Sequence, residues 1–167
     1  DAFLALADAC GGYAGMLPEI EAIWDYVEAL DGPAATVALN TIAEAQFAHL
    51  FRSLAAEGVA PDLIRAIEAD EARHAAAGRR RNPPPAHEIE PVVRDLEDLI
   101  EALVTAPFFC VPLARIAGVR GLARAGLALW RAHADACGFL GIVPGLRRFR
   151  AGCIAGLAKP QPVQMVM

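Results

Sequence analysis

Apolar residues recur at intervals of three and four along most of the chain, the spacing of one face of an α-helix. Ile20, Ile23, Trp24, Val27 and Leu30 form one such stripe. Runs in which apolar and polar residues strictly alternate, as they do in half-buried strands, are absent from the sequence. The pattern therefore predicts an all-α fold, an antiparallel helical bundle.

Glycines and prolines divide the pattern into segments, and Pro18 and Pro91 suit the first turn of a helix. The expected helices span 2–10, 18–30, 33–57, 61–78, 91–103 and 112–137, with an apolar connector over 107–112 and an extended tail after Lys159. Residues 82–87 read as a proline-rich linker. We expect one domain over 1–167, with the helices of a candidate metal site in 1–81 and C-terminal helices in 88–167.

Composition limits the class of protein. The mean hydropathy of +0.36 is high, yet no apolar run reaches the roughly 18 residues that a membrane span needs. The chain begins with Asp1 and shows no signal segment, as a processed fragment that lacks upstream residues would. Cys10, Cys110, Cys137 and Cys153 form no CxxC pair, which favours buried free thiols in a reducing, cytoplasmic setting.

Charge is distributed unevenly, although the net value is only -5. Most acidic residues precede position 102, and beyond it Asp135 is the single acid among many arginines. We interpret these arginines as the solvent-exposed faces of core helices. The alternative is that they bind an acidic protein or a membrane surface. Arg79, Arg80 and Arg81 stand at a predicted helix end, where cations stabilise the helix dipole, so we expect no nucleic acid partner.

Candidate metal chemistry lies in the run from Asp70 to His74. Glu71 and His74 are three residues apart, so a helix places both on one face. Glu44, on the preceding helix, shares a stripe with Phe47 and Phe51, where an ionised carboxylate is costly without a cation or donors. Counted from the turn near Gly58, Glu44 and Glu71 lie at heights that differ by roughly 5 Å. Glu44, Glu71 and His74 can therefore converge on one metal ion; otherwise Glu71 pairs with an arginine and His74 is a core histidine.

This pattern resembles the second half of the ferritin-like di-iron carboxylate family, which includes acyl-carrier-protein desaturases and the ribonucleotide reductase small subunit. The resemblance covers roughly residues 37–78. It implies that Glu44 is the lone helix glutamate, Glu71 the bridging glutamate and His74 the terminal imidazole ligand. Asp70 resembles the acid that orients a histidine ligand in parts of that family.

The family's first half-site is missing from the sequence. Gln46, Pro84 and Trp130 stand three residues before the other histidines, so there is no second Glu-x-x-His. A further carboxylate could come from Glu21, Asp25 or Glu28, or from Glu97 or Glu101 after the linker. We take Glu21 as the first of these candidates.

The resemblance implies an oxidoreductase that uses dioxygen on a hydrophobic or carrier-bound substrate. Its cofactor would be iron, a di-iron pair if a second half-site exists, with manganese as the alternative. Phe47, Phe51 and Trp24 would line the pocket. The competing hypothesis is a metal-free, degenerate helical module that binds an acidic protein or contacts a membrane peripherally; a homodimer is compatible with either.

Overall fold

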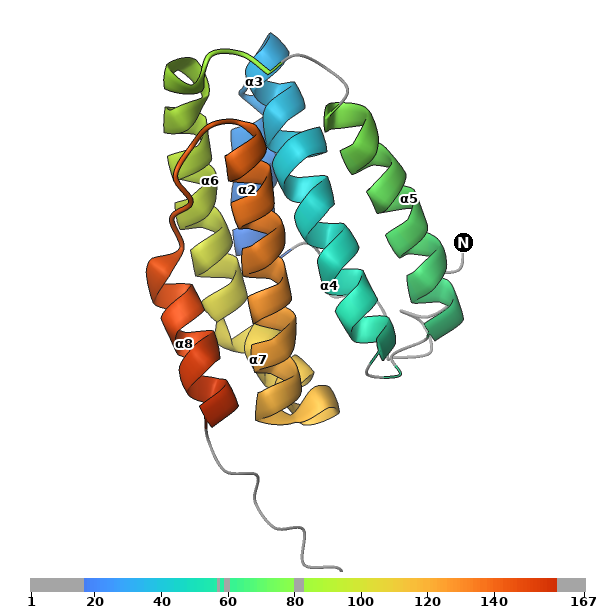
Figure 1. Ribbon diagram of the computed structural model, residues 1–167. Helices are drawn as coiled ribbons and strands as arrows, with labels where there is room; N and C mark the ends of the chain where they lie inside the picture. The colour runs from blue at the N-terminus through green and yellow to red at the C-terminus, as the bar shows by residue number, and fades with distance from the viewer. Residues whose placement is uncertain (1–16, 57, 59–60, 80–82, 159–167) are drawn as a thin grey trace, which may run out of the picture.

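The computed structural model describes residues 17–56, 58, 61–79 and 83–158, and over this part of the chain every regular element is a helix (Figure 1). The all-α prediction is therefore confirmed. The elements are α2 (Pro18–Glu28), α3 (Gly32–Thr36), the π-helical segment η1 (Val37–Ala43), α4 (Glu44–Ala56), α5 (Pro61–Arg79), α6 (Ala86–Thr105), α7 (Pro107–Phe139) and α8 (Arg147–Ala158). The expected helix over 2–10, Cys10, Arg80, Arg81 and the tail after Lys159 lie outside the described residues.

Helix α4 lies between two neighbours, with α5 packed on one side and α7 on the other (Figure 1). α6 packs on α2 and α7, and α8 packs on α7. Glu44 lies near His74 while Arg52 pairs with Glu68, so rising numbers in α4 meet falling numbers in α5. The two helices are therefore antiparallel, as the short turn between them predicts.

The core lies where α2, η1, α6 and α7 meet. Its most deeply buried apolar side chains include Ile42, Val93, Leu96 and Cys137, each at most 2% exposed. Gly78 of α5 lies against the same segment η1, since a β-carbon there would come 2.7 Å from the Asn40 carbonyl oxygen. The absence of a side chain at Gly78 lets α5 approach η1 closely.

Helix α6 begins at Ala86, five residues before the predicted start at Pro91 and inside the expected 82–87 linker. Pro91 removes one backbone donor from the helix interior, which favours a start at that residue. The additional turn, however, buries Ile89 to 2% exposure in the core. Burial of such a side chain contributes about 2 kcal/mol, which offsets the missing hydrogen bond.

Helix α7 begins at Pro107, so the predicted connector over 107–112 is helical. The α-helix is interrupted at Gly118, whose φ of 69° and ψ of 169° lie in a region that only glycine readily adopts. Helix α8 is not predicted from the sequence, because Gly152 and Gly156 weaken its helix propensity. No helix in the described part of the chain combines the length and apolar character that a bilayer crossing needs.

The predicted helix over 33–57 is continuous in backbone but not uniform. Residues Val37–Ala43 form a π-helical segment that leads directly into Glu44, the first residue of α4. π-Helical segments are rare in proteins, and those that do occur often lie at functional sites. The segment therefore draws attention to the side chains that α4 presents immediately after it.

Candidate functional site

The structure brings Glu44, Glu71 and His74 together at the interface of α4 and α5, and we call these three residues the α4–α5 group. One ligand atom from each residue lies within 4.8 Å of the others. His74 Nδ1 is 3.6 Å from Glu44 Oε1 and 4.0 Å from Glu71 Oε2. These separations exceed hydrogen-bond lengths but suit atoms bound to one ion, which stand roughly 3 to 4 Å apart when each bond is about 2.1 Å.

The two carboxylates of the α4–α5 group are mostly covered, whereas the imidazole is open to solvent. The side chains of Glu44 and Glu71 are 20% and 23% exposed, and that of His74 is 53% exposed. Glu44 Oε2 is buried and has no hydrogen-bond partner. A buried carboxylate oxygen without a donor is unfavourable, and a bound cation would satisfy it.

Asp70, the predicted orienting acid, lies on the opposite side of the His74 ring from the two glutamates. Its Oδ1 is 3.9 Å from His74 Nε2, while His74 Nδ1 faces Glu44 and Glu71. The same Oδ1 accepts a hydrogen bond from Arg73 at 2.6 Å. Asp70 is therefore near the second ring nitrogen, while it accepts its hydrogen bond from Arg73.

The remaining residues predicted for the site are spread over two helices. Phe47 and Phe51 stack on α4 with ring centroids 6.2 Å apart, and Phe47 is 44% exposed. Trp24 on α2 is 54% exposed and donates a hydrogen bond to Glu28 of its own helix. Glu21 is exposed on α2 and does not belong to the α4–α5 group.

A second set of potential ligands lies in the interior. Glu97 of α6 and His133 and Cys137 of α7 also bring one ligand atom each within 4.8 Å, and we call them the core group. His133 and Cys137 are 0% exposed and Glu97 is 5% exposed. His133 Nε2 lies 2.6 Å from Glu97 Oε1 and 3.3 Å from Cys137 Sγ.

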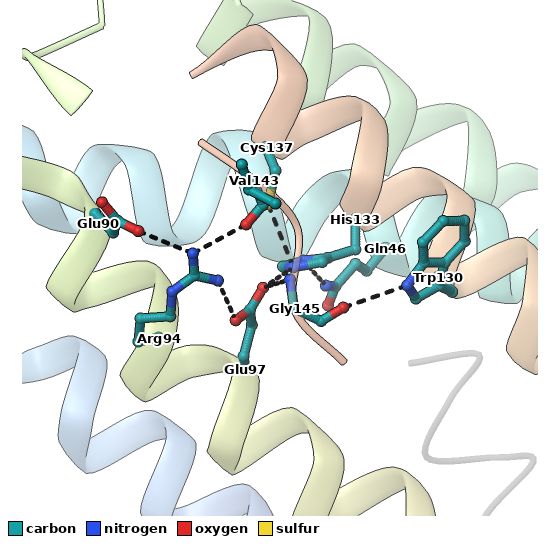
Figure 2. Close-up of polar contacts among 9 residues, drawn as sticks. All are labelled: Gln46, Glu90, Arg94, Glu97, Trp130, His133, Cys137, Val143 and Gly145. Carbon is teal, nitrogen blue, oxygen red and sulfur yellow. Dashed lines mark hydrogen bonds and ion pairs between the residues drawn. The ribbon is translucent and has the colours of Figure 1, made fainter. Parts of the chain in front are cut away.

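Glu97 fastens the loop between α7 and α8 onto the core, as Figure 2 shows. Its Oε1 accepts the Gly145 N–H at 2.6 Å, and its Oε2 accepts a hydrogen bond from Arg94 at 2.8 Å. Arg94 also donates to the Val143 carbonyl at 3.0 Å, and the Trp130 indole donates to the Gly145 carbonyl at 3.4 Å. A β-carbon at residue 145 would overlap the Glu97 carboxylate, so glycine is required for this approach.

The other ring nitrogen of His133 faces α4. His133 Nδ1 is 3.0 Å from Gln46 Nε2, so the amide donates to Nδ1 and the ring donates from Nε2 to Glu97 (Figure 2). This pairing makes the imidazole neutral. Burial lowers the pKa of His133 despite the opposing effect of Glu97, in agreement with a neutral ring.

Glu97 and Cys137 differ in protonation. Burial alone would raise the pKa of Glu97, but the hydrogen bonds from His133, Arg94 and Gly145 outweigh it and lower the pKa. Glu97 is therefore an ionised carboxylate at neutral pH. Burial raises the pKa of Cys137 to about 12, so its sulfur is a protonated thiol and not an activated nucleophile.

Comparison with other proteins yields no relative for this chain. Neither a protein family, nor a curated protein, nor a solved structure matches it. The functional argument therefore rests on the side-chain geometry.

The sequence pattern does not join the members of the core group. It offers Glu97 only as one of several further carboxylates, and it gives His133 no metal role because Trp130, not a glutamate, stands three residues before it. The available signal was the position of Glu97 within the apolar stripe of α6, one residue after Leu96 and three before Ile100. A carboxylate in such a stripe needs a partner, and His133 and Cys137, four residues apart on one helix face, could have supplied it.

Proposed function

We propose that the chain is a metal-binding helical bundle of ferritin-like type, in which Glu44, Glu71 and His74 hold one divalent ion. The observation that carries this proposal is the geometry of the α4–α5 group. Three ligand atoms stand at a spacing too wide for hydrogen bonds, and Glu44 Oε2 is buried without a partner.

The donor set favours iron, with manganese as the alternative. Two carboxylates and one imidazole are ligands suited to these ions, and the group contains no sulfur that would select a softer metal. The exposed His74 edge leaves room for water or a small molecule beside the ion. One iron or manganese ion per chain is the expected stoichiometry, because the α4–α5 group supplies one set of ligands for such an ion.

The proposed activity is oxidation of a hydrophobic or carrier-bound organic substrate with dioxygen, and it rests on the family resemblance. A bound iron ion would supply the redox chemistry. Glu44 and Glu71 would balance its charge, while the exposed ring of Phe47, one helical turn along α4 from Glu44, offers an apolar surface for the substrate.

The second candidate function is that of a metal-free module for an anionic partner, either an acidic protein or a membrane surface. It is favoured by α8, where Arg147, Arg148 and Arg150 are exposed and no acidic residue occurs within the helix. The lack of a second Glu-x-x-His also favours it.

Metal content tests the first proposal directly. Protein purified without chelator should contain about one iron or manganese per chain by elemental analysis, and Glu71→Ala should lose it. Glu68→Ala is the matched control, since Glu68 lies on the same helix but pairs with Arg52 outside the group. Absence of metal after anaerobic ferrous loading would contradict the proposal and leave the metal-free module. A ratio near two would place a second ion elsewhere in the protein.

A further inference from the structure

We propose that the core group is a second, buried metal site, in which Glu97, His133 and Cys137 take a zinc-type ion. This inference does not depend on the function proposed for the α4–α5 group. It rests on three buried side chains of different chemistry whose ligand atoms already lie together, and on the hydrogen bonds that hold them from outside.

The ligand types distinguish this site from the α4–α5 group. A carboxylate, an imidazole and a thiolate form a mixed set of hard and soft donors, and zinc accepts all three. Manganese and iron ions that prefer oxygen ligands have less affinity for a thiolate than zinc has. Cys137 therefore makes the core group selective for a different metal.

The present distances need only a small adjustment. Cys137 Sγ and His133 Nε2 are 3.3 Å apart, close to the separation of two ligands on one zinc ion. Glu97 Oε1 and His133 Nε2 are 2.6 Å apart because a proton lies between them. An ion at about 2.0 Å from each would widen that gap to roughly 3.3 Å, so it would replace the proton and move the two atoms apart by less than about 1 Å.

The proton balance is straightforward. Binding through Nε2 requires the ring proton on Nδ1, where the Gln46 amide can turn its carbonyl oxygen to accept it. The Cys137 thiol releases one proton to solvent, and Glu97 is already ionised. The resulting site contains two anionic ligands and one neutral ligand around a dication, which is a neutral unit that a protein interior can hold.

The ligands of the core group are hydrogen-bonded by neighbouring residues, as the ligands of metal sites usually are. Ligating histidines commonly have a partner on the second ring nitrogen, and ligating carboxylates are themselves hydrogen-bonded. Gln46 supplies the first contact, and Arg94 and Gly145 supply the second. Three protein ligands leave the fourth position of the ion for a water molecule.

Complete burial implies that the ion enters when the protein folds, as in structural zinc sites. The test is therefore to refold the full chain with Co²⁺ as a spectroscopic substitute for zinc. Wild-type protein should show thiolate-to-cobalt charge-transfer absorption in the near ultraviolet, and after refolding with Zn²⁺ and dialysis it should retain about one zinc per chain. The α4–α5 group contains no thiol, so this absorption cannot arise there.

Matched variants assign the signal. Cys137→Ala and Cys137→Ser should abolish the charge-transfer band and the retained zinc, whereas Cys153→Ala, which removes another buried thiol, should keep both. Glu71→Ala should also keep both, which separates this result from the outcome of the iron test. The inference is overturned if refolded wild-type protein shows no thiolate–cobalt band, or if the band persists in a helical Cys137→Ala or Cys137→Ser variant.

Discussion

Glu44 and Gln46 are two residues apart on α4, and their side chains point to different neighbouring helices. Glu44 lies 3.6 Å from His74 of α5, and Gln46 lies 3.0 Å from His133 of α7. Residues two apart on an α-helix point about 200° away from each other, which explains how one helix reaches both groups. Helix α4 therefore separates a partly exposed carboxylate site from a fully buried polar cluster.

Glu97→Gln should destabilise the protein strongly. The amide cannot carry the charge that Arg94, His133 and the Gly145 N–H all contact, and Arg94 is left without its least exposed partner. Because the Arg94 side chain is 38% exposed, solvent screens part of this loss, and we expect a decrease of about 2 kcal/mol in free energy of unfolding. Urea denaturation would measure the loss, with Glu101→Gln, one turn along α6, expected to change stability by less than about 0.5 kcal/mol. Equal effects at the two positions would contradict the role assigned to Glu97.

Gly145→Ala should lower the stability of the protein more than most glycine-to-alanine substitutions in the described part of the chain. The new β-carbon would overlap the Glu97 carboxylate and force the α7–α8 loop away from the core. We expect a loss of about 2 kcal/mol or more, typical of overpacking combined with a broken buried hydrogen bond.

Gly152→Ala is the matched control for this prediction. Residue 152 lies within α8, and a β-carbon there meets no atom within 4 Å. Replacing an interior helical glycine by alanine should raise stability by about 0.5 to 1 kcal/mol. Thermal unfolding of the two variants should therefore shift in opposite directions, and a shared direction would disprove the packing described for Gly145.

Stability should fall on mild acidification in protein freed of metal. Because burial lowers the pKa of His133, the unfolded chain, with an ordinary histidine pKa of 6.5, binds the proton more readily than the folded chain. The stabilisation is fully present above that pH and is lost below it, by up to about 1.4 kcal/mol per pH unit. The lowered pKa of Glu97 adds a further loss below its ordinary value of 4.5.

His49 contributes in the same sense, since burial is the largest cause of its lowered pKa as well. Denaturation of His49→Gln between pH 7.5 and 5.5 therefore isolates the effect of His133. We expect a clear decrease in the free energy of unfolding over this range. A flat profile in His49→Gln would show that His133 does not become harder to protonate on folding.

The α4–α5 group should respond to metal through stability. In the absence of metal, Glu44→Ala combined with Glu71→Ala should stabilise the protein, because it removes two repelling carboxylates that lie near one another. With ferrous ion at about 100 times its dissociation constant, the wild type should gain about 2.7 kcal/mol and the double variant nothing. Thermal shifts under anaerobic conditions would show both effects, and an identical iron response in the two proteins would rule out the site.

The sequence was sufficient for the helical class and for the approach of Glu44 to His74, since both follow from spacing within helices and a short turn between them. It was insufficient for α6, because Pro91 favours a helix start that the burial of Ile89 overrides. Such an override depends on tertiary contacts that local propensity does not contain.

The core group was not predictable as a unit, because Glu97 is far in the chain from His133 and Cys137. Its assembly, with Gln46 beside it, depends on how α4, α6 and α7 pack. The contact of Gly145 with Glu97 depends further on the path of a loop. The one signal in the sequence is Glu97, a charged residue among the apolar residues of α6.

The π-helical segment before Glu44 has a consequence for the length of the chain. A short π-helical stretch accommodates one residue more than an α-helix of the same span, while the flanking turns keep their facing. Val37–Ala43 is therefore a place where a one-residue deletion, for example of the exposed Leu39, can restore a regular α-helix. Glu44 would still face α5 and Gln46 would still face α7, so the two polar groups would tolerate this change in residue number.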